Sequence, residues 1–147
     1  MEQVRVILAN IERMKCVPEE VLGQILPYYA EKYTRYKREE DARQELVCGI
    51  LLRKYLGVWK TGQVGYGKDG KPFLLERQWK YNLTHSGVWV ALGLSDAEIG
   101  VDIERIRRYH SATARKLFTE EEQVMLEQVE SEEARNALFT RLWTEWE

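Results

Sequence analysis

The spacing of apolar residues changes along the chain, and each spacing predicts a different kind of element. Val4, Val6 and Leu8 occupy every second position, which predicts a short opening strand. Between residues 40 and 56 the apolar residues recur at helical spacing, and Gly57 can end the resulting helix. Its apolar positions are Ala42, Leu46, Val47, Ile50, Leu51 and Leu56.

Two prolines divide the segment between the opening strand and this helix. Pro18 is expected to start a helical stretch, which Glu19 and Glu20 favour in its first turn, and Pro27 interrupts that stretch. The residues from 28 to 38 are rich in aromatic and basic side chains. Four of them are cations, namely Lys32, Arg35, Lys37 and Arg38.

After a glycine-rich stretch at residues 62–70, the pattern becomes typical of strands. Residues 81–83, 88–94 and 99–103 are β-rich, and turns are expected at Ser86-Gly87 and Ser95-Asp96. Connections this short predict antiparallel pairing. Together with the long helix, the pattern predicts an α+β fold with a helix packed on an antiparallel sheet.

Beyond Arg108 the pattern returns to that of helices. Thr119 followed by Glu122 is typical of a capping box at a helix start. A last helix is expected to begin at residues 131–133 and to present an apolar face of Ala134, Leu138, Leu142 and Trp146. It has no glycine, proline or basic last turn before Glu147.

Composition narrows the class of protein without naming its chemistry. The 147 residues carry a net charge of −2, so no general affinity for nucleic acid is expected, and a phosphate site would need a few locally placed cations. No apolar run approaches the ~18 residues of a membrane span, and Glu2 and Arg5 argue against a signal peptide. Cys48 lies in the apolar helix and is expected to be a buried, inert thiol. Cytoplasmic localisation fits these features.

Asp102 and Glu104 form the first group of residues that could carry chemistry. On a strand, residues two apart share a face, so the two carboxylates would lie side by side, with Val101 and Ile103 on the other face. Paired carboxylates suit a hard divalent cation such as Mg²⁺. The alternative is the solvent-exposed face of an edge strand.

The run Asn82-Leu83-Thr84-His85-Ser86-Gly87 ends a predicted strand in a polar turn. Thr84, His85, Ser86 and their backbone N–H groups could donate to a phosphate. The alternative is a set of ordinary polar turn residues. The sequence has no GxSxG or Walker motif, so it offers no support for a serine hydrolase or a P-loop protein.

Two further short motifs are weaker on their own. Lys71, between Gly70 and Pro72, would lie on a constrained turn and could face an anion, although a solvated lysine is the alternative. In the last helix, Trp143 and Glu147 are four residues apart and share a face. A core tryptophan beside a surface acid is the alternative there.

Taken together and in this order, the motifs resemble those of the Sfp-type 4′-phosphopantetheinyl transferases. The motifs are Gly-Lys-Pro (70–72), Asn-x-Thr-His-Ser (82–86), Gly-Val-Asp-Ile-Glu (100–104), Phe-Thr-x-x-Glu (118–122) and Trp-Thr-x-x-Glu (143–147). An upstream Asp41-Ala42 helix start also matches. The resemblance covers nearly the whole chain, and the second and third motifs are its most specific part.

The resemblance implies a fold of two similar α+β halves with coenzyme A bound between them. Residues 1–104 would be the first half, and residues 105–147 the helical start of a second, incomplete half. The implied activity is Mg²⁺-dependent transfer of 4′-phosphopantetheine from the co-substrate coenzyme A to a serine of an acyl or peptidyl carrier protein. No nucleic acid or membrane is expected as a partner.

The resemblance also implies roles for individual residues. Asp102, Glu104 and Glu147 match the metal-binding acids, and Glu147 is also the candidate catalytic residue. The candidate coenzyme A-binding residues are Lys32, Lys71, Pro72, Thr84 and His85, with Lys32 expected near the 3′-phosphate.

Two departures from the family pattern leave an alternative open. Trp146 stands where the family has a lysine, and the family continues for about half a domain beyond Glu147. The chain could therefore be a truncated, non-catalytic homologue that binds coenzyme A or a carrier protein, and a plain interaction domain with chance matches is a remoter alternative. We further expect one copy of the chain to leave four apolar side chains exposed, namely Leu138, Leu142, Trp143 and Trp146. A second copy would then cover them in a homo-oligomer.

Overall fold

The structure, a computed structural model, describes residues 3–14, 18–76 and 79–146. The chain folds as two compact units, Met1–Ile103 and Glu104–Glu147. Each has a hydrophobic cluster of its own. The fold is α+β, as the sequence predicts, and the sheets lie in the first unit.

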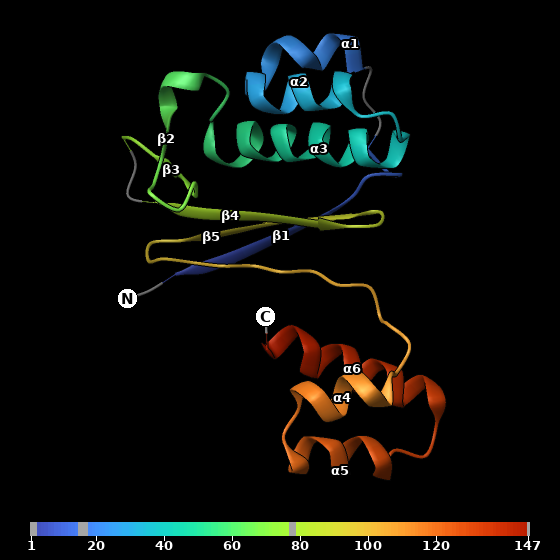
Figure 1. The fold of residues 1–147 in the computed structure, drawn as a ribbon. Coiled ribbons are helices and arrows are strands. Elements are labelled where there is room, and N and C mark those ends of the chain that lie inside the picture. Colours follow the sequence, from blue (N-terminus) through green and yellow to red (C-terminus); the bar gives the residue numbers. More distant parts are fainter. Residues whose placement is uncertain (1–2, 15–17, 77–78, 147) are drawn as a thin grey trace. The chain divides into compact units, whose positions relative to one another are not determined.

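The first unit contains helices on one side of an antiparallel sheet (Figure 1). Its helical elements are α1 (Pro18–Val21), η1 (Leu22–Gln24), α2 (Pro27–Arg35), α3 (Glu39–Leu56) and η2 (Thr61–Gln63). Its strands are β1 (Val4–Asn10), β2 (Val64–Tyr66), β3 (Pro72–Leu74), β4 (Lys80–Ser86) and β5 (Trp89–Ser95).

Helix α3 forms the centre of this unit and confirms the predicted span within one residue. Its first turn carries three acids, which interact favourably with the positive end of the helix dipole. It ends where Gly57 adopts φ 65°, a left-handed conformation that glycine accommodates readily. The helix contributes Val47, Leu51 and Leu52 to the cluster that also contains the core residues of the sheet, and Cys48 is 1% exposed, which confirms its predicted burial.

Pro27 separates two helical segments, as predicted, and is itself the first residue of α2. At this position its missing N–H group costs no helical hydrogen bond. The basic, aromatic segment is therefore largely helical. Helix α2 packs along α3, which is flanked by the sheet on its other side in Figure 1.

The main sheet has the strand order β1-β5-β4, and both pairs are antiparallel. The hairpin of β4 and β5 turns at Gly87, with φ 59°, which agrees with the predicted turn. On β5, Val90, Leu92 and Leu94 belong to the core beneath α3. The register places Val4, Val6 and Leu8 on the opposite face, where all three are exposed.

The predicted third strand at residues 99–103 is absent, because this segment has no regular secondary structure. Instead of joining a ladder, it crosses the outer face of β5: a side chain placed at Gly93 would clash with Ile99 and Val101. The Val101 N–H group donates to Asn82 Oδ1 at 2.9 Å rather than to a strand partner. Both sides of β5 are already paired with β1 and β4, so no place beside it remains.

The second unit consists of α4 (Ser111–Leu117), α5 (Glu120–Gln128) and α6 (Glu132–Trp146). Both hydrogen bonds of the predicted capping box are present: Glu122 N–H donates to Thr119 Oγ1, and Thr119 N–H donates to Glu122 Oε1. The core of this unit contains Ala114, Phe118, Leu126, Phe139 and Leu142.

The expectation that the apolar face of the last helix is left exposed is wrong for the described residues. Leu142 is only 6% exposed, and Leu138 and Trp143 pack against the same cluster. Helices α4 and α5 supply the covering side chains, which the helical pattern of α6 alone could not indicate. The homo-oligomer stays a prediction, but an exposed apolar face of the last helix no longer supports it.

No helix in the described ranges combines the length and the apolar character required to cross a membrane.

Candidate coenzyme A and metal site

Three of the sequence motifs meet within the first unit through three hydrogen bonds. Lys71 Nζ donates to the carbonyl oxygen of Ile99 at 2.9 Å, across 28 residues of sequence. Asn82 Oδ1 accepts from the N–H group of Val101, and Thr84 Oγ1 donates to Asp102 Oδ1 at 3.3 Å. The Asn-x-Thr-His-Ser motif is thus bonded directly to Gly-Val-Asp-Ile-Glu, and Gly-Lys-Pro is connected to them through Ile99, the residue before that motif.

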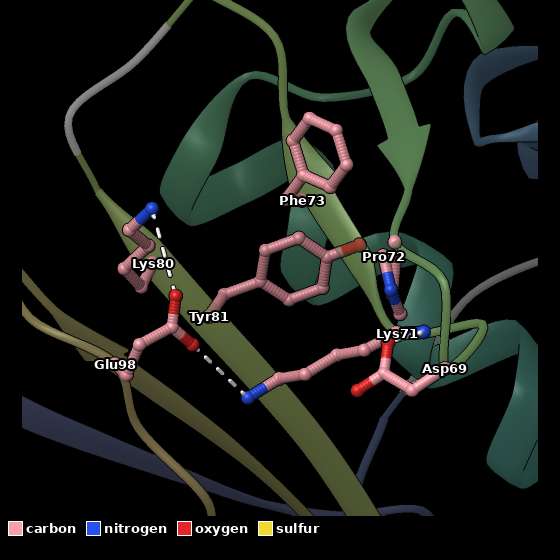
Figure 2. Close-up of a pocket in the computed structure, with 8 residues that line it drawn as sticks. Asp69, Lys71, Pro72, Phe73, Lys80, Tyr81 and Glu98 are labelled. Carbon is pink, nitrogen blue, oxygen red and sulfur yellow. Dashed lines mark hydrogen bonds and ion pairs between the residues drawn. The ribbon is translucent and has the colours of Figure 1, made fainter.

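Lys71 and Pro72 line a cavity of about 370 Å³ at the end of the small β2–β3 sheet (Figure 2). The turn before them includes Gly70 at φ 81°, a conformation that strongly favours glycine, and Asp69 Oδ1 accepts the Lys71 N–H group. Lys71 therefore emerges from a constrained turn, in agreement with its predicted place. Its ammonium group also pairs with Glu98 at 3.5 Å.

Tyr81 and Pro72 also line a second cavity of about 210 Å³, so the two cavities are neighbours. Tyrosine side chains dominate the second one, which Tyr28, Tyr29 and Tyr66 also line. Burial raises the pKa of Tyr81 to about 12, and burial likewise raises the pKa of Tyr29 above its ordinary value. Both phenols stay protonated at neutral pH and can donate hydrogen bonds.

Thr84 and His85 lie on opposite faces of β4. Thr84 is paired with Ala91 and faces outward toward Asp102, whereas His85 is paired with Val90 of the core face. His85 Nε2 lies 3.5 Å from Glu45 Oε1 of α3. The sequence placed both residues in one polar turn, but the period of the strand sends their side chains to different sides.

Lys32 approaches the same Glu45 from α2, with Nζ 3.8 Å from Oε1. The Glu45 side chain is 6% exposed, so one buried carboxylate holds a lysine and a histidine from two other elements. Burial alone would lower the pKa of Lys32, but the Tyr28 hydroxyl and Glu45 outweigh it and the pKa is raised. Lys32 therefore stays charged at neutral pH, as an anion-binding lysine must.

The two predicted metal-binding acids differ in their surroundings. Asp102 is exposed and accepts only the Thr84 hydrogen bond at 3.3 Å among the contacts described, so it can take a cation without losing a buried partner. Glu104, the first residue of the second unit, is bound by Arg107 at 3.0 Å. Both offer the carboxylate oxygens that Mg²⁺ prefers, although Glu104 would have to exchange Arg107 for the ion.

Glu147, the third predicted acid, lies outside the described residues. Among residues 3–14, 18–76 and 79–146, no group of three His, Cys, Asp or Glu side chains gathers as a metal site would require. Asp102 belongs to the first unit and Glu104 to the second, so a Mg²⁺ ion held by both acids stays a prediction.

Comparison with known proteins agrees with this set of motifs. Residues 98–145 match the family described as the 4′-phosphopantetheinyl transferase superfamily. The chain is 31% identical over 119 residues to the 4′-phosphopantetheinyl transferase gsp of Aneurinibacillus migulanus. The matched region covers 78% of this chain and 49% of the relative. It is 27% identical over 134 residues to the transferase Sfp of Bacillus subtilis strain 168, covering 86% of this chain and 58% of the relative. The chain belongs to the 4′-phosphopantetheinyl transferase family.

A further relative is AcpT of Salmonella typhi, a 4′-phosphopantetheinyl transferase that is 41% identical over 99 residues. That match covers 65% of this chain and 50% of the relative. The chain thus spans about half the length of the curated relatives it matches.

In this phosphopantetheinyl transferase family member, sequence reasoning missed three charged residues next to the predicted site. Glu45 could have been noticed as an acid within the buried stretch of α3. Lys80 and Glu98 form an ion pair at 3.6 Å, and both also line the cavity of Lys71. Their proximity depends on the hairpin register that places Lys80 opposite Ser95, so it arises only when β4 and β5 pair.

Proposed function

We propose that this protein transfers 4′-phosphopantetheine from coenzyme A to a serine of an acyl or peptidyl carrier protein, with Mg²⁺ as cofactor. The observation that carries the proposal is the junction of three motifs far apart in sequence. The hydrogen bonds from Lys71 to Ile99, from Val101 to Asn82 and from Thr84 to Asp102 connect a cation, a polar strand and an exposed carboxylate. Family membership supports the reaction class.

In this proposal, two groups of basic side chains bind the phosphates of coenzyme A. Lys71, on its constrained turn beside Pro72, would bind the pyrophosphate from the larger cavity. Lys32 and His85, which both contact Glu45, would bind a second phosphate near α2. The neighbouring tyrosine-lined cavity offers an apolar wall to the rest of the ligand.

Asp102, Glu104 and Glu147 are the proposed Mg²⁺ ligands. When bound, the ion would offset negative charge on the pyrophosphate. Thr84 would keep the Asp102 carboxylate in place through its hydroxyl group. The carrier serine oxygen would bond to phosphorus as the bond to 3′,5′-ADP breaks, and Glu147 would accept the serine proton.

A second candidate function is binding of coenzyme A or a carrier protein without transfer. Trp146 favours it, because an indole at the family's lysine position removes a cation expected near the pyrophosphate. The occupied state of Glu104, which Arg107 binds at 3.0 Å, points the same way.

Mass spectrometry of a generic apo acyl carrier protein tests the two candidates. The protein is incubated with the carrier, coenzyme A and Mg²⁺, and the carrier is expected to gain the mass of one phosphopantetheine group. Asp102→Asn should lower the transfer rate on the order of 100-fold, the equivalent of about 3 kcal/mol of lost charge stabilisation. Glu130→Gln, which removes an exposed negative charge after α5, should leave the rate unchanged.

Coenzyme A binding by calorimetry separates the remaining outcomes. Binding without any carrier adduct would reject transfer and support the non-catalytic alternative. Neither binding nor transfer would reject both candidates for this chain.

A further inference from the structure

The larger cavity contains a carboxylate that lies between two lysines. Glu98 Oε2 is 3.5 Å from Lys71 Nζ, and Glu98 Oε1 is 3.6 Å from Lys80 Nζ. Figure 2 shows the Glu98 side chain directed toward both ammonium groups, with Tyr81 in the same cavity. One glutamate thus bridges two cations through its two oxygens, as a phosphate group would.

The contacts of Glu98 are those of a weakly held side chain. Its side chain is 74% exposed, and both ion pairs are longer than the 2.7–2.9 Å typical of a strong charge-assisted hydrogen bond. Exposed ion pairs of this kind contribute little to stability, because water screens them and both side chains lose freedom. Release of Glu98 from the lysines would therefore be a small energetic step.

Removal of Glu98 would leave both lysines on the same backbone positions. Lys71 Nζ keeps its hydrogen bond to the Ile99 carbonyl at 2.9 Å, and the backbone of Lys80 is held in strand β4 by its pairing with β5. Asp69, the other acid of the cavity, is engaged by the backbone N–H group of Lys71. Removal of Glu98 would leave two ammonium groups facing a cavity of about 370 Å³, which is within the range of ligand sites.

We propose that Glu98 is a tethered competitor of the phosphate ligand, and that Lys80 is a second phosphate-binding residue beside Lys71. The ligand class is a diphosphate, whose two anionic groups can replace the bridging carboxylate. This inference rests on the proposed function for the identification of that diphosphate as part of coenzyme A. In the free protein, the single negative charge of Glu98 offsets part of the positive charge of both lysines and so lowers the affinity of the site for an anion.

Calorimetric titration with inorganic pyrophosphate, at fixed ionic strength and without divalent ions, tests the inference on the full chain. Glu98→Gln is expected to tighten pyrophosphate binding by about three- to tenfold, the equivalent of two exposed ion pairs. Glu76→Gln removes an exposed glutamate outside this cavity and changes the net charge equally, so it should leave the affinity within about twofold.

Lys80→Gln tests the second lysine in the same assay. It should weaken pyrophosphate binding by about threefold or more, whereas Lys54→Gln at the end of α3 should have little effect. In the Lys80→Gln background, the gain from Glu98→Gln should shrink, because one of the two cations that Glu98 contacts is gone. Circular dichroism checks that each variant is folded.

The inference is overturned if Glu98→Gln binds pyrophosphate no more tightly than Glu76→Gln, or if neither the wild type nor Glu98→Gln binds it. These results are separate from the test of the proposed function. Tighter pyrophosphate binding by Glu98→Gln without any carrier adduct would leave the anion site standing and reject transfer. If the protein transfers phosphopantetheine but Glu98→Gln leaves the affinity for pyrophosphate unchanged, the proposed function stands and the role of Glu98 is rejected.

Discussion

Tyr81 lies at the point where the core of the first unit meets the candidate site. It is 4% exposed and belongs to the hydrophobic cluster, yet it lines both neighbouring cavities. Burial, together with the smaller effects of the nearby Tyr66 and Tyr28, raises its pKa from 10.0 to about 12. The folded state therefore holds the phenol proton more tightly than the unfolded chain does.

We expect this tyrosine to make stability depend on pH at alkaline values. Its contribution is fully present below pH 10 and is lost as the pH rises toward about 12, because the unfolded chain releases the proton first. Between pH 9 and pH 11, Tyr81→Phe should reduce the loss in the free energy of unfolding by about 1 kcal/mol. Urea denaturation at both pH values measures it.

Tyr55→Phe, at an exposed tyrosine of α3, serves as the matched control and should show the wild-type pH dependence. An identical alkaline loss in the wild type and in Tyr81→Phe would contradict the assignment.

At the scale of elements, the segment at residues 99–103 connects the sheet to the candidate metal site. Ile99 and Val101 pack over Gly93 on the outer face of β5, and Asp102 follows directly. The segment has no ladder of backbone hydrogen bonds, so its position depends on this packing and on single contacts to Asn82, Lys71 and Thr84. A glycine in the middle of a strand is what allows the close approach.

Gly93→Ala is expected to destabilise the protein by about 1–3 kcal/mol, since the added methyl group would collide with Val101 and lie 3.1 Å from Ile99 Cδ1. Gly62→Ala, where an added methyl group meets nothing within 4 Å, is the control and should stay within about 0.5 kcal/mol. Thermal or urea denaturation measures both variants. Equal stability of the two would show that Ile99 and Val101 do not need to pack so closely on β5.

At the scale of the whole molecule, the described chain has two hydrophobic clusters that share no residue. Leu52 belongs to one and Leu126 to the other, and both are fully buried. A cavity in either cluster removes contacts among the residues of that cluster. Local opening should therefore differ between the units.

We expect Leu126→Ala to cost about 2–5 kcal/mol in the second unit and to accelerate amide hydrogen exchange first in α4, α5 and α6. Leu52→Ala should instead accelerate exchange first in α3, β4 and β5. Val124→Ala, at an exposed position of α5, is the control for the helix itself. Hydrogen exchange followed by mass spectrometry would contradict the expectation if either core variant accelerated both units equally.

Local patterns determined most of the elements of this protein. The span of α3, the capping box at Thr119 and the turn at Gly87 follow from residues within a few positions of one another, so the sequence alone predicts them. Family membership is predictable for a related reason, because it depends on short motifs in a fixed order rather than on their contacts. The same holds for the α+β class, which requires only the periods of 3.6 and 2.

Only the tertiary structure decided how these elements meet. The pairing of β1 with β5, the irregular path of residues 99–103 and the burial of Leu142 each depend on partners far away in sequence. The same is true of the candidate site, where Lys71 reaches Ile99 and Glu98 bridges two lysines. The neighbours of a residue in sequence set its backbone preference and the face of the element on which it lies. Distant groups reach that face only when the chain packs, so only the packed chain decides which charges pair with one another.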